Sequence, residues 1–412
     1  MRISTLQAFN NGVTGIQRNY SNATRTQEQI STGNRILTPA DDPVASVRLL
    51  QLEQQQSVLS QYNSNLTAAK NSLTQEEVTL NSVNTVLQRV RELAVQAGNG
   101  ALDPQDRKSI AAELGEREDE LLSLMNTRNA RGEYLFSGFQ GKTQPFVRSG
   151  EGSYRYEGDE GQRKLQIASS LSIPISDNGK SVFQSVINAG RLSMSPEAET
   201  IIAPAVRLSA PLVDDEVAFA AFDFPATGVE VRFSDISDPK KYQIYAVGGS
   251  TVLYENRLDE NDKSSDKIVF KGMTIHVDGT PNGTETFTIK RSGLEKQGIL
   301  DTVANLRMAL ESPATGNNGV RDAVAVALTN LDHGMVSVDQ ARGDIGARLN
   351  VIETTQTDNE DVALVNKGVQ ADLRELDYAE ALSRLSMQTV VLEAAQQSYV
   401  KIAGLSLFNA MR

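Results

Sequence analysis

The sequence lacks cysteine and tryptophan altogether and contains only two histidines among its 412 residues. A chain without cysteine can form no disulfide, no thiolate metal site and no cysteine nucleophile. Neither His276 nor His333 has a second histidine at the spacing of a metal-binding pair, and the H-E-x-x-H pattern is absent. The sequence therefore predicts a protein that holds no metal and no cofactor.

Other patterns that mark enzymes are missing as well. The chain contains no Walker motif, no G-x-G-x-x-G and no G-x-S-x-G. The acidic segment DENDKSSD at 259–266 resembles a calcium-binding loop, but it lacks the glycine and the final glutamate that such a loop needs, so we interpret it as a solvated turn. Acidic residues are numerous enough to leave carboxylate-based hydrolysis open, yet nothing singles out a pair. We expect no catalytic residue and no enzymatic activity.

Long apolar runs and basic blocks are also absent. No apolar stretch reaches the length of about 18 residues that suggests a transmembrane helix, and the N-terminus has no apolar core of a secretory signal peptide. The net charge of −12 argues against nucleic acid as a partner, because a phosphate-binding protein needs a cationic face. The sequence therefore predicts contact with neither a membrane nor nucleic acid.

Helical periodicity is what the sequence has in abundance. Leucines recur at every seventh position from Leu52 to Leu87. This repeat predicts a helix over about 43–97, roughly 80 Å long at 1.5 Å per residue. A helix with one narrow apolar stripe needs a partner along its whole length. The low aromatic content of 5% also suits elongated helices better than one thick core.

Both ends of the chain carry apolar seams with alternating spacings of three and four. The seam residues are Leu6, Phe9, Val13, Ile16, Tyr20, Ala23, Gln27 and Ile30 at the N-terminal end, and Tyr378, Leu382, Leu385, Leu392 and Tyr399 at the C-terminal end. Neither seam is wide enough to bury itself. We therefore predict that the first and last helices pack together, which makes the domains discontinuous in sequence.

The segment STGNRILTPADDP at 31–43 interrupts this helical pattern. Gly33 stands where a left-handed residue ends a helix, and Asp42 precedes Pro43 as the N-cap and first residue of the next helix. The segment predicts a helix end, an extended linker and a new helix. Adjacent carboxylates can be catalytic, but we interpret Asp41 and Asp42 as capping or solvated residues.

The middle of the chain changes to shorter elements. A helix is expected after Asp103-Pro104, with Ile110, Leu114, Leu121 and Leu124 on its buried face, and GSYRYEGDEGQRKLQIA predicts a hairpin across its GDEG turn. Between 190 and 292 the segments VEVRFS, KYQIYAV, KIVFKGMTIHV and ETFTIK predict strands, with PNGT as a tight connection. Helical patterns resume with ILDTVANLRMALE and continue in a long helix through 324–352.

The fold class expected from this order is α+β, with long antiparallel helices from both termini and an inserted, mainly β outer domain. We predict three domains. They are a terminal-helix coiled coil of residues 1–42 plus 372–412, a long-helix bundle with β-hairpins of residues 43–189 plus 293–371, and a β-rich insertion of residues 190–292.

Several segments resemble one known family. ISTGNRILTPADDPVASVRL, LQRVRELAVQAGNG and DRKSIAAEL are similar to successive blocks of bacterial flagellins and their relatives. GEYLFSGFQGKTQPF and the C-terminal DYAEALSRLSMQTVVLEAAQQSYVKIAGLSLFNAMR are more similar to the family members of the hook–filament junction than to the filament subunit. The resemblance covers about 1–188 and 293–412.

The resemblance implies an extracellular structural protein of the bacterial flagellum, exported unfolded by the flagellar type III apparatus without a cleaved signal peptide. It also implies four partners: further copies in a ring, the other junction protein on the hook side, flagellin on the filament side, and an export chaperone at the C-terminal helix. The segment 31–43 would connect an inner layer of terminal helices to an outer layer. The expected assembly interface is Leu6, Phe9, Val13, Ile16, Tyr20, Ile30, Tyr378, Leu382, Leu385, Leu392, Tyr399, Leu405, Leu407 and Phe408.

Two alternatives remain open at this point. The chain could be the filament subunit itself, which GEYLFSGFQGKTQPF disfavours. It could also be an axial scaffold whose β insertion binds glycans or acts as an enzyme. Glycan binding would use exposed aromatic rings, for which Tyr242, Tyr245 and Tyr254 are candidates, whereas packing in a core or across strands is the competing interpretation.

Overall fold

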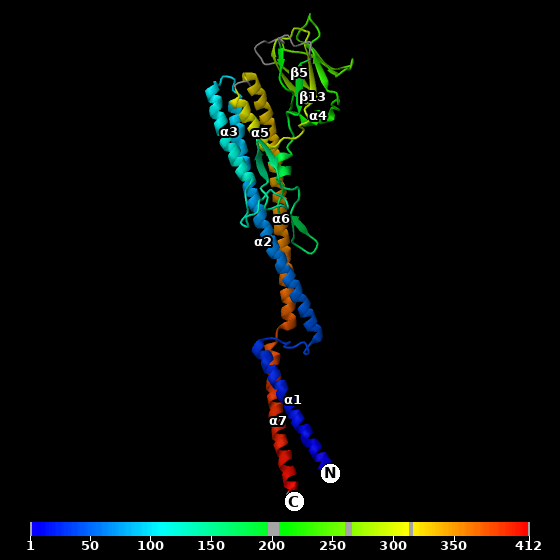
Figure 1. The fold of residues 1–412 in the computed structure, drawn as a ribbon. Coiled ribbons are helices and arrows are strands. Elements are labelled where there is room, and N and C mark those ends of the chain that lie inside the picture. Colours follow the sequence, from blue (N-terminus) through cyan, green and yellow to red (C-terminus); the bar gives the residue numbers. More distant parts are fainter. Residues whose placement is uncertain (1, 151, 197–205, 260–265, 313–315, 411–412) are drawn as a thin grey trace. The chain divides into compact units, whose positions relative to one another are not determined.

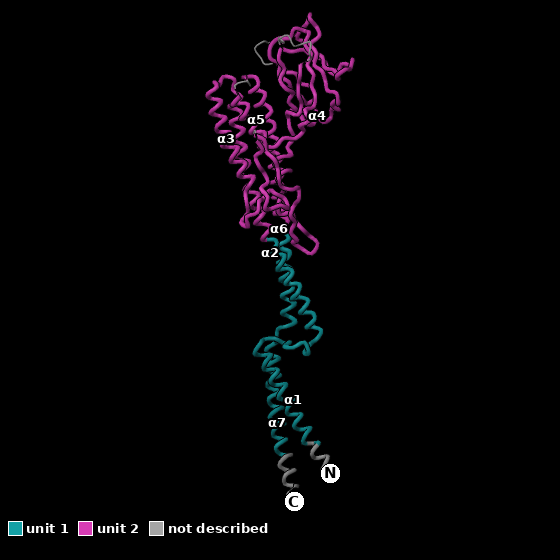
Figure 2. The backbone as a smooth tube through the Cα atoms, in the orientation of Figure 1, with its two compact units in different colours: residues 1–66, 353–412 teal, residues 67–352 magenta. Residues whose placement is uncertain are grey.

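The structure is a computed structural model of the chain. It describes residues 2–150, 152–196, 206–259, 266–312 and 316–410, and the side chains at 2–6, 8 and 402–410 are not described. The chain divides into two compact units, one of residues 1–66 with 353–412 and the other of residues 67–352 (Figure 2). The first, called unit 1, joins both ends of the chain, as the two terminal seams predict. The second is called unit 2.

Helices account for most of the described chain (Figure 1). They are α1 (Arg2–Thr32), α2 (Pro43–Ala97), α3 (Pro104–Met125), α4 (Glu216–Ala221), α5 (Ile299–Glu311), α6 (Gly316–Arg374) and α7 (Tyr378–Ala410), with a π-helical turn η1 at Lys180–Gln184. The predicted helix over 43–97 is confirmed as α2. Asp42 caps it, since its Oδ1 accepts the Ala45 N–H at 2.9 Å.

The strands are short and all their pairings are antiparallel. They are β1 (Phe146–Ser149), β2 (Ser153–Tyr156), β3 (Lys164–Gln166), β4 (Ser172–Pro174), β5 (Leu192–Pro196), β6 (Val206–Leu208), β7 (Leu212–Val213), β8 (Val229–Arg232), β9 (Lys241–Ala246), β10 (Val252–Arg257), β11 (Asp266–Phe270), β12 (Met273–Gly279) and β13 (Thr286–Arg291). β1 pairs with β2 and β3 with β4. The larger sheets run β10-β9-β8-β13-β5 and β11-β12-β6, with β7 also paired to β12.

The helical core of unit 2 follows the heptad repeat of α2. Leu73, Leu80 and Leu87 are completely buried, and so are Val83 and Val90 at the other seam position. The facing stripe of α6 has the same alternation of spacings, with Val324, Ala327, Leu331, Val338, Ala341, Ile345 and Ile352 buried. These leucine and valine rows explain why the middle of α2 is so regular in sequence.

The strands β5 to β13 enclose a hydrophobic core of their own. Its members include Val231, Phe233, Ile268, Ile275 and Phe287, all buried. The first and last strands of this region are neighbours, since Leu192 of β5 pairs with Arg291 of β13. A separate core with adjacent ends supports the division at 190 and 292, and the three-domain division itself stays a prediction.

Some local predictions are wrong. The predicted hairpin across GDEG does not form, because β2 pairs back with β1 and β3 pairs onward with β4. The prediction of PNGT as a connection between strands is not among them, since PNGT lies between β12 and β13, which belong to different sheets. In α3 the buried residue near the C-terminal end is Met125 rather than Leu124.

Candidate functional site

Two connectors in unit 1 link the terminal helices to the long helices, and they are hydrogen-bonded to each other. Gly33, with φ of 70°, ends α1 in the left-handed conformation, and its N–H donates to the Gln29 carbonyl at 2.8 Å. Next, Arg35 N–H donates to the Arg374 carbonyl at 2.7 Å, while Leu376 N–H donates to the Gly33 carbonyl at 3.0 Å. The connector 33–42 therefore pairs with the end of α6 and with residues 375 and 376.

The adjacent acids of this connector have structural roles. Asp41 accepts the backbone N–H groups of Leu37 and Thr38 at 3.0 and 3.1 Å and forms an ion pair with Arg25 of α1. Asp42 caps α2. Both carboxylates thus bond backbone N–H groups in the turn and at the start of α2, which agrees with the interpretation of Asp42 as a capping residue.

The helices α1 and α7 lie side by side along unit 1 (Figure 1). The Phe9 and Tyr399 rings are in contact, with centroids 5.2 Å apart. The more buried side chains of α7 form one regular stripe: Ala381, Leu385, Gln388, Leu392, Ala395 and Tyr399. The seam of α1 contains Val13, Ile16, Asn19, Ala23, Thr26 and Ile30. Both seams contain polar or small residues, so this helix pair buries little apolar surface.

The predicted interface residues fall into three groups. Val13, Ile16, Ile30, Leu385, Leu392 and Tyr399 are partly buried. Phe9, Tyr20, Tyr378 and Leu382 are more exposed, with Tyr20 at 63% and Leu382 at 55%. Leu6, Leu405, Leu407 and Phe408 lie outside the described side chains. The assembly role of all these residues stays a prediction.

Unit 1 also exposes apolar side chains outside the seams. On α7 they are Met387, Val390, Val391 and Val400, and on the parts of α2 and α6 in unit 1 they are Val44, Val47, Leu50, Val58, Val362, Leu364 and Val365. Leu364 is 70% exposed. The buried seam positions of α6 in this unit are instead polar: Thr355, Asn359 and Asn366. The part of α6 in unit 1 therefore buries polar residues and exposes apolar ones, and an exposed apolar surface of this kind is typical of one that a partner covers.

Unit 2 contains a buried charged cluster at a seam position of α2. Glu76 is only 1% exposed, and its Oε1 accepts the Asp177 N–H at 3.0 Å. The Asp177 carboxylate receives two hydrogen bonds from Arg348 of α6, each 3.0 Å long. Burial, with a contribution from the nearby Asp177 charge, raises the pKa of Glu76 well above its usual range. The folded chain thus favours the neutral form of this carboxyl.

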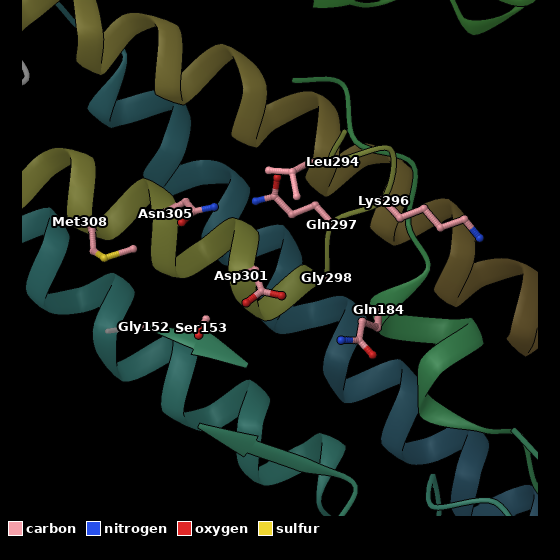
Figure 3. A pocket seen from close by; sticks show the side chains of 10 residues that line it. All are labelled: Gly152, Ser153, Gln184, Leu294, Lys296, Gln297, Gly298, Asp301, Asn305 and Met308. Atoms are coloured by element: carbon pink, nitrogen blue, oxygen red, sulfur yellow. The ribbon is translucent and has the colours of Figure 1, made fainter. Parts of the chain in front are cut away.

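A pocket of about 340 Å³ lies beside the start of α5 (Figure 3). It is lined by Gly152 and Ser153 of the β1–β2 hairpin, by Gln184, by residues 294–298 and by Asp301, Asn305 and Met308 of α5. Asp301 accepts the Tyr154 N–H at 2.9 Å, and burial raises its pKa. No second carboxylate is among the described lining residues, so the pocket offers no paired acid and base.

Among the described residues, no group of three histidine, cysteine or carboxylate side chains could hold a metal ion, and no helix is long and apolar enough to cross a membrane. His333 Nδ1 lies 3.0 Å from the Ile187 carbonyl oxygen. Most of the acidic segment at 259–266 lies outside the described residues. Tyr242 and Tyr254 belong to the β core or pack against it, which favours packing over sugar binding for these two rings.

Comparisons with known proteins identify the class to which this fold belongs. Residues 3–141 match the family described as the bacterial flagellin N-terminal helical region. Flagellar hook-associated protein 3 of Salmonella typhimurium is 25% identical over the full length of both chains, and that of Escherichia coli is 24% identical over 99% of each. The crystal structure of the flagellar junction protein FlgL from Legionella pneumophila has a TM-score of 0.63 at 26% identity and covers 80% of this chain and 100% of that one.

The chain is similar to the flagellin family of bacterial flagellar proteins, whose N-terminal helical region matches its residues 3–141. Within that family it is similar over its whole length to the hook-associated proteins, and the resemblance inferred from its sequence motifs is confirmed. It is a component of the flagellum with the α+β fold expected for the family.

Two features of unit 1 were missed in the sequence. Heptad patterns show that α1 and α7 need partners, but the pairing of Asn34 with Glu375 joins residues far apart in the chain and leaves no local signal. The polar seam of α6 left a partial signal, since TQTDNED weakens the apolar pattern near 355–361.

Proposed function

We propose that this chain is a non-enzymatic adaptor that joins the hook side of the hook–filament junction to the flagellin filament. The observation that carries the proposal is the outward-facing apolar surface of unit 1, where Tyr20, Leu364 and Val390 are exposed. Such a surface is costly in water, at roughly 25 cal/mol per Å² of exposed apolar area, and is stabilised when other helices cover it. The full-length similarity to hook-associated proteins supports the same role.

The partners follow from this role. Copies of the chain form a ring through the exposed faces of α1 and α7, the other junction protein contacts the ring on its hook side, and flagellin adds on the filament side. An export chaperone covers the C-terminal helix α7 before assembly, since α7 carries apolar side chains such as Leu382 and Val391 outside its seam. Export proceeds through the flagellar type III apparatus without a cleaved signal peptide, and the protein acts outside the cell.

A gene deletion tests the adaptor role. Cells without the chain should complete their hooks and secrete flagellin that remains unpolymerised in the medium, and the wild-type gene should restore filaments. Filaments that still form on the hooks of deleted cells would contradict the adaptor role. Loss of flagellin itself from both filament and medium would identify the chain as the filament subunit instead.

A further inference from the structure

The loop of residues 137–141 presents one exposed aromatic ring from a rigid base. Phe139 is 67% exposed, whereas Phe136, three residues earlier, is completely buried. The Phe136 ring packs edge-on against Phe183 of η1, with centroids 5.0 Å apart. Phe136, just before the loop, therefore fixes the start of the loop in the core of unit 2.

The exposed side of the loop is held by one carboxylate. Asp159 accepts the backbone N–H groups of Phe139, Gln140 and Gly161 at 2.9, 2.9 and 2.7 Å. Partial burial acts to raise the pKa of Asp159, but these three donors hold it below its usual range. This is the actual role of the GDEG segment, which the sequence pattern had assigned to a hairpin turn.

Two glycines make the arrangement possible. Gly138 has φ of 70°, and a Cβ there would lie only 2.3 Å from the Asp159 carboxylate. At Gly161 a Cβ would lie 2.1 Å from the Phe139 ring. The ring thus rests on the bare backbone of Gly161 while its other side faces outward. The conformation of this loop, which these two glycines allow, keeps the Phe139 side chain out of the core.

We propose that Phe139 is an anchor that docks against a second copy of this chain, next to it in the junction ring. A rigid aromatic ring loses little conformational entropy on binding, which is why such rings dominate many interfaces. The inference rests on the proposed function, because it needs copies placed side by side.

The size of the contact argues for a neighbour that is already in place. A Phe side chain buries about 150–250 Å² at most, so this ring supplies far less than the roughly 800 Å² per partner of a stable interface. Phe139 alone could not recruit a free protein from solution. It can fix the spacing of a subunit that other contacts already hold at high effective concentration.

The charges around the loop suit a second copy. Glu160 pairs with Lys180 beside Gly161, and Glu133 pairs with Arg163 at 2.8 Å beside Gly141. Each of these two pairs is internally neutral, whereas the whole chain carries a net charge of −12. The negative charge of Asp159 beside them is held by three backbone N–H groups. Two copies repel each other overall, so a close contact between them is favoured where most of the flanking charges are already paired.

A photo-crosslink tests the docking directly. The photoreactive residue p-benzoylphenylalanine replaces Phe139 in a strain that carries this chain as its only copy, and isolated flagella are irradiated. We expect an adduct of two copies, at twice the 44.7 kDa of the chain. The matched control places the same residue at Ile236, an exposed apolar position elsewhere in unit 2, where no such adduct is expected.

The other outcomes would overturn the inference. An adduct with flagellin or with the hook-side protein would give Phe139 a different partner, and no adduct in assembled junctions would mean that the ring docks nowhere. Absence of the chain from the junction would contradict the proposed function instead.

Substitutions of Phe139 give a second measurement. Phe139→Ala should keep the wild-type melting temperature while lowering the yield of stable junctions at least severalfold, and Phe139→Tyr should restore that yield. An unchanged yield for Phe139→Ala would also overturn the docking.

Discussion

At the scale of single residues, Glu76 shows how a charged residue in a heptad seam couples the fold to pH. Its neighbours are Asp177, whose charge opposes ionisation, and Arg348 and Arg163, whose charges favour it. Burial dominates and raises the pKa of Glu76. The stabilisation of the neutral carboxyl is fully present below the pKa of an unfolded glutamate, about 4.3, and is lost as the pH rises through the higher pKa of the folded state.

We therefore predict that Glu76→Gln stabilises the protein at alkaline pH and has little effect at pH 4. The Gln side chain is neutral at every pH, and its oxygen can still accept the Asp177 N–H. Because burial raises the pKa of Glu76, we expect the gain in the free energy of unfolding to grow as the pH rises and to be largest at pH 8. Urea unfolding of both proteins between pH 4 and pH 8 measures this gain in stability.

Glu77→Gln, the same substitution at the adjacent and less buried position, is the control. A difference between Glu76→Gln and wild type that did not change with pH would contradict the assignment.

At the scale of elements, the positions of the helices were predicted from the sequence more accurately than the residues through which the helices contact one another. The spacings of three and four predicted α2, α5 and the α1–α7 pair. The predicted seam of α1 differs from the observed one at Tyr20 and Gln27, which are exposed while Asn19 and Thr26 are partly or fully buried; the predicted positions Ala23 and Ile30 lie in the observed seam. Spacings of three and four can follow each other in either order, so the sequence pattern alone did not fix these two positions.

Strand pairing could not be predicted in the same way. Alternating residues correctly indicated β2 and β3, but alternation does not say which strand is the partner. The decisive interaction is the Asp159 carboxylate, which binds the backbone of residues 139–140 instead of closing a hairpin. The same limit explains why the paired connectors and the exposed position of Phe139 became visible only in the fold.

The α1–α7 seam can be tested with one charge. We predict that Leu385→Asp abolishes junction assembly while unit 2 stays folded. Leu385 lies in the partly buried stripe of α7, and an aspartate there is either desolvated or separates the helices, at a cost of several kcal/mol. Ser386→Asp adds the same charge at the adjacent exposed position and should assemble. Motility and electron microscopy of flagella measure assembly, and calorimetry measures unit 2. Wild-type motility with Leu385→Asp would refute the seam.

At the scale of the whole molecule, the β-rich insertion 190–292 is attached through few bonds. Its ends adjoin, since Ser292 N–H donates to the Arg191 carbonyl at 2.8 Å. Arg321 of α6 forms a bidentate ion pair with Asp278 at 2.8 Å, and Arg207 pairs with Asp322 at 3.1 Å. These pairs are partly exposed, so each contributes at most about 1 kcal/mol to holding the insertion against α6.

We predict that the insertion folds alone and that the rest of the chain folds without it. A variant that joins Gly190 to Gly293 through a short Gly/Ser linker should keep its helical circular dichroism, because Arg321 and Asp322 remain to pair with each other at 3.1 Å. The excised piece should give a β spectrum and a cooperative melt from its own core. An unfolded product on either side would place the domain boundary elsewhere. If the shortened chain folds and still assembles, the adaptor role resides in the helices. If it folds but junctions fail, the β insertion makes a contact that the junction requires.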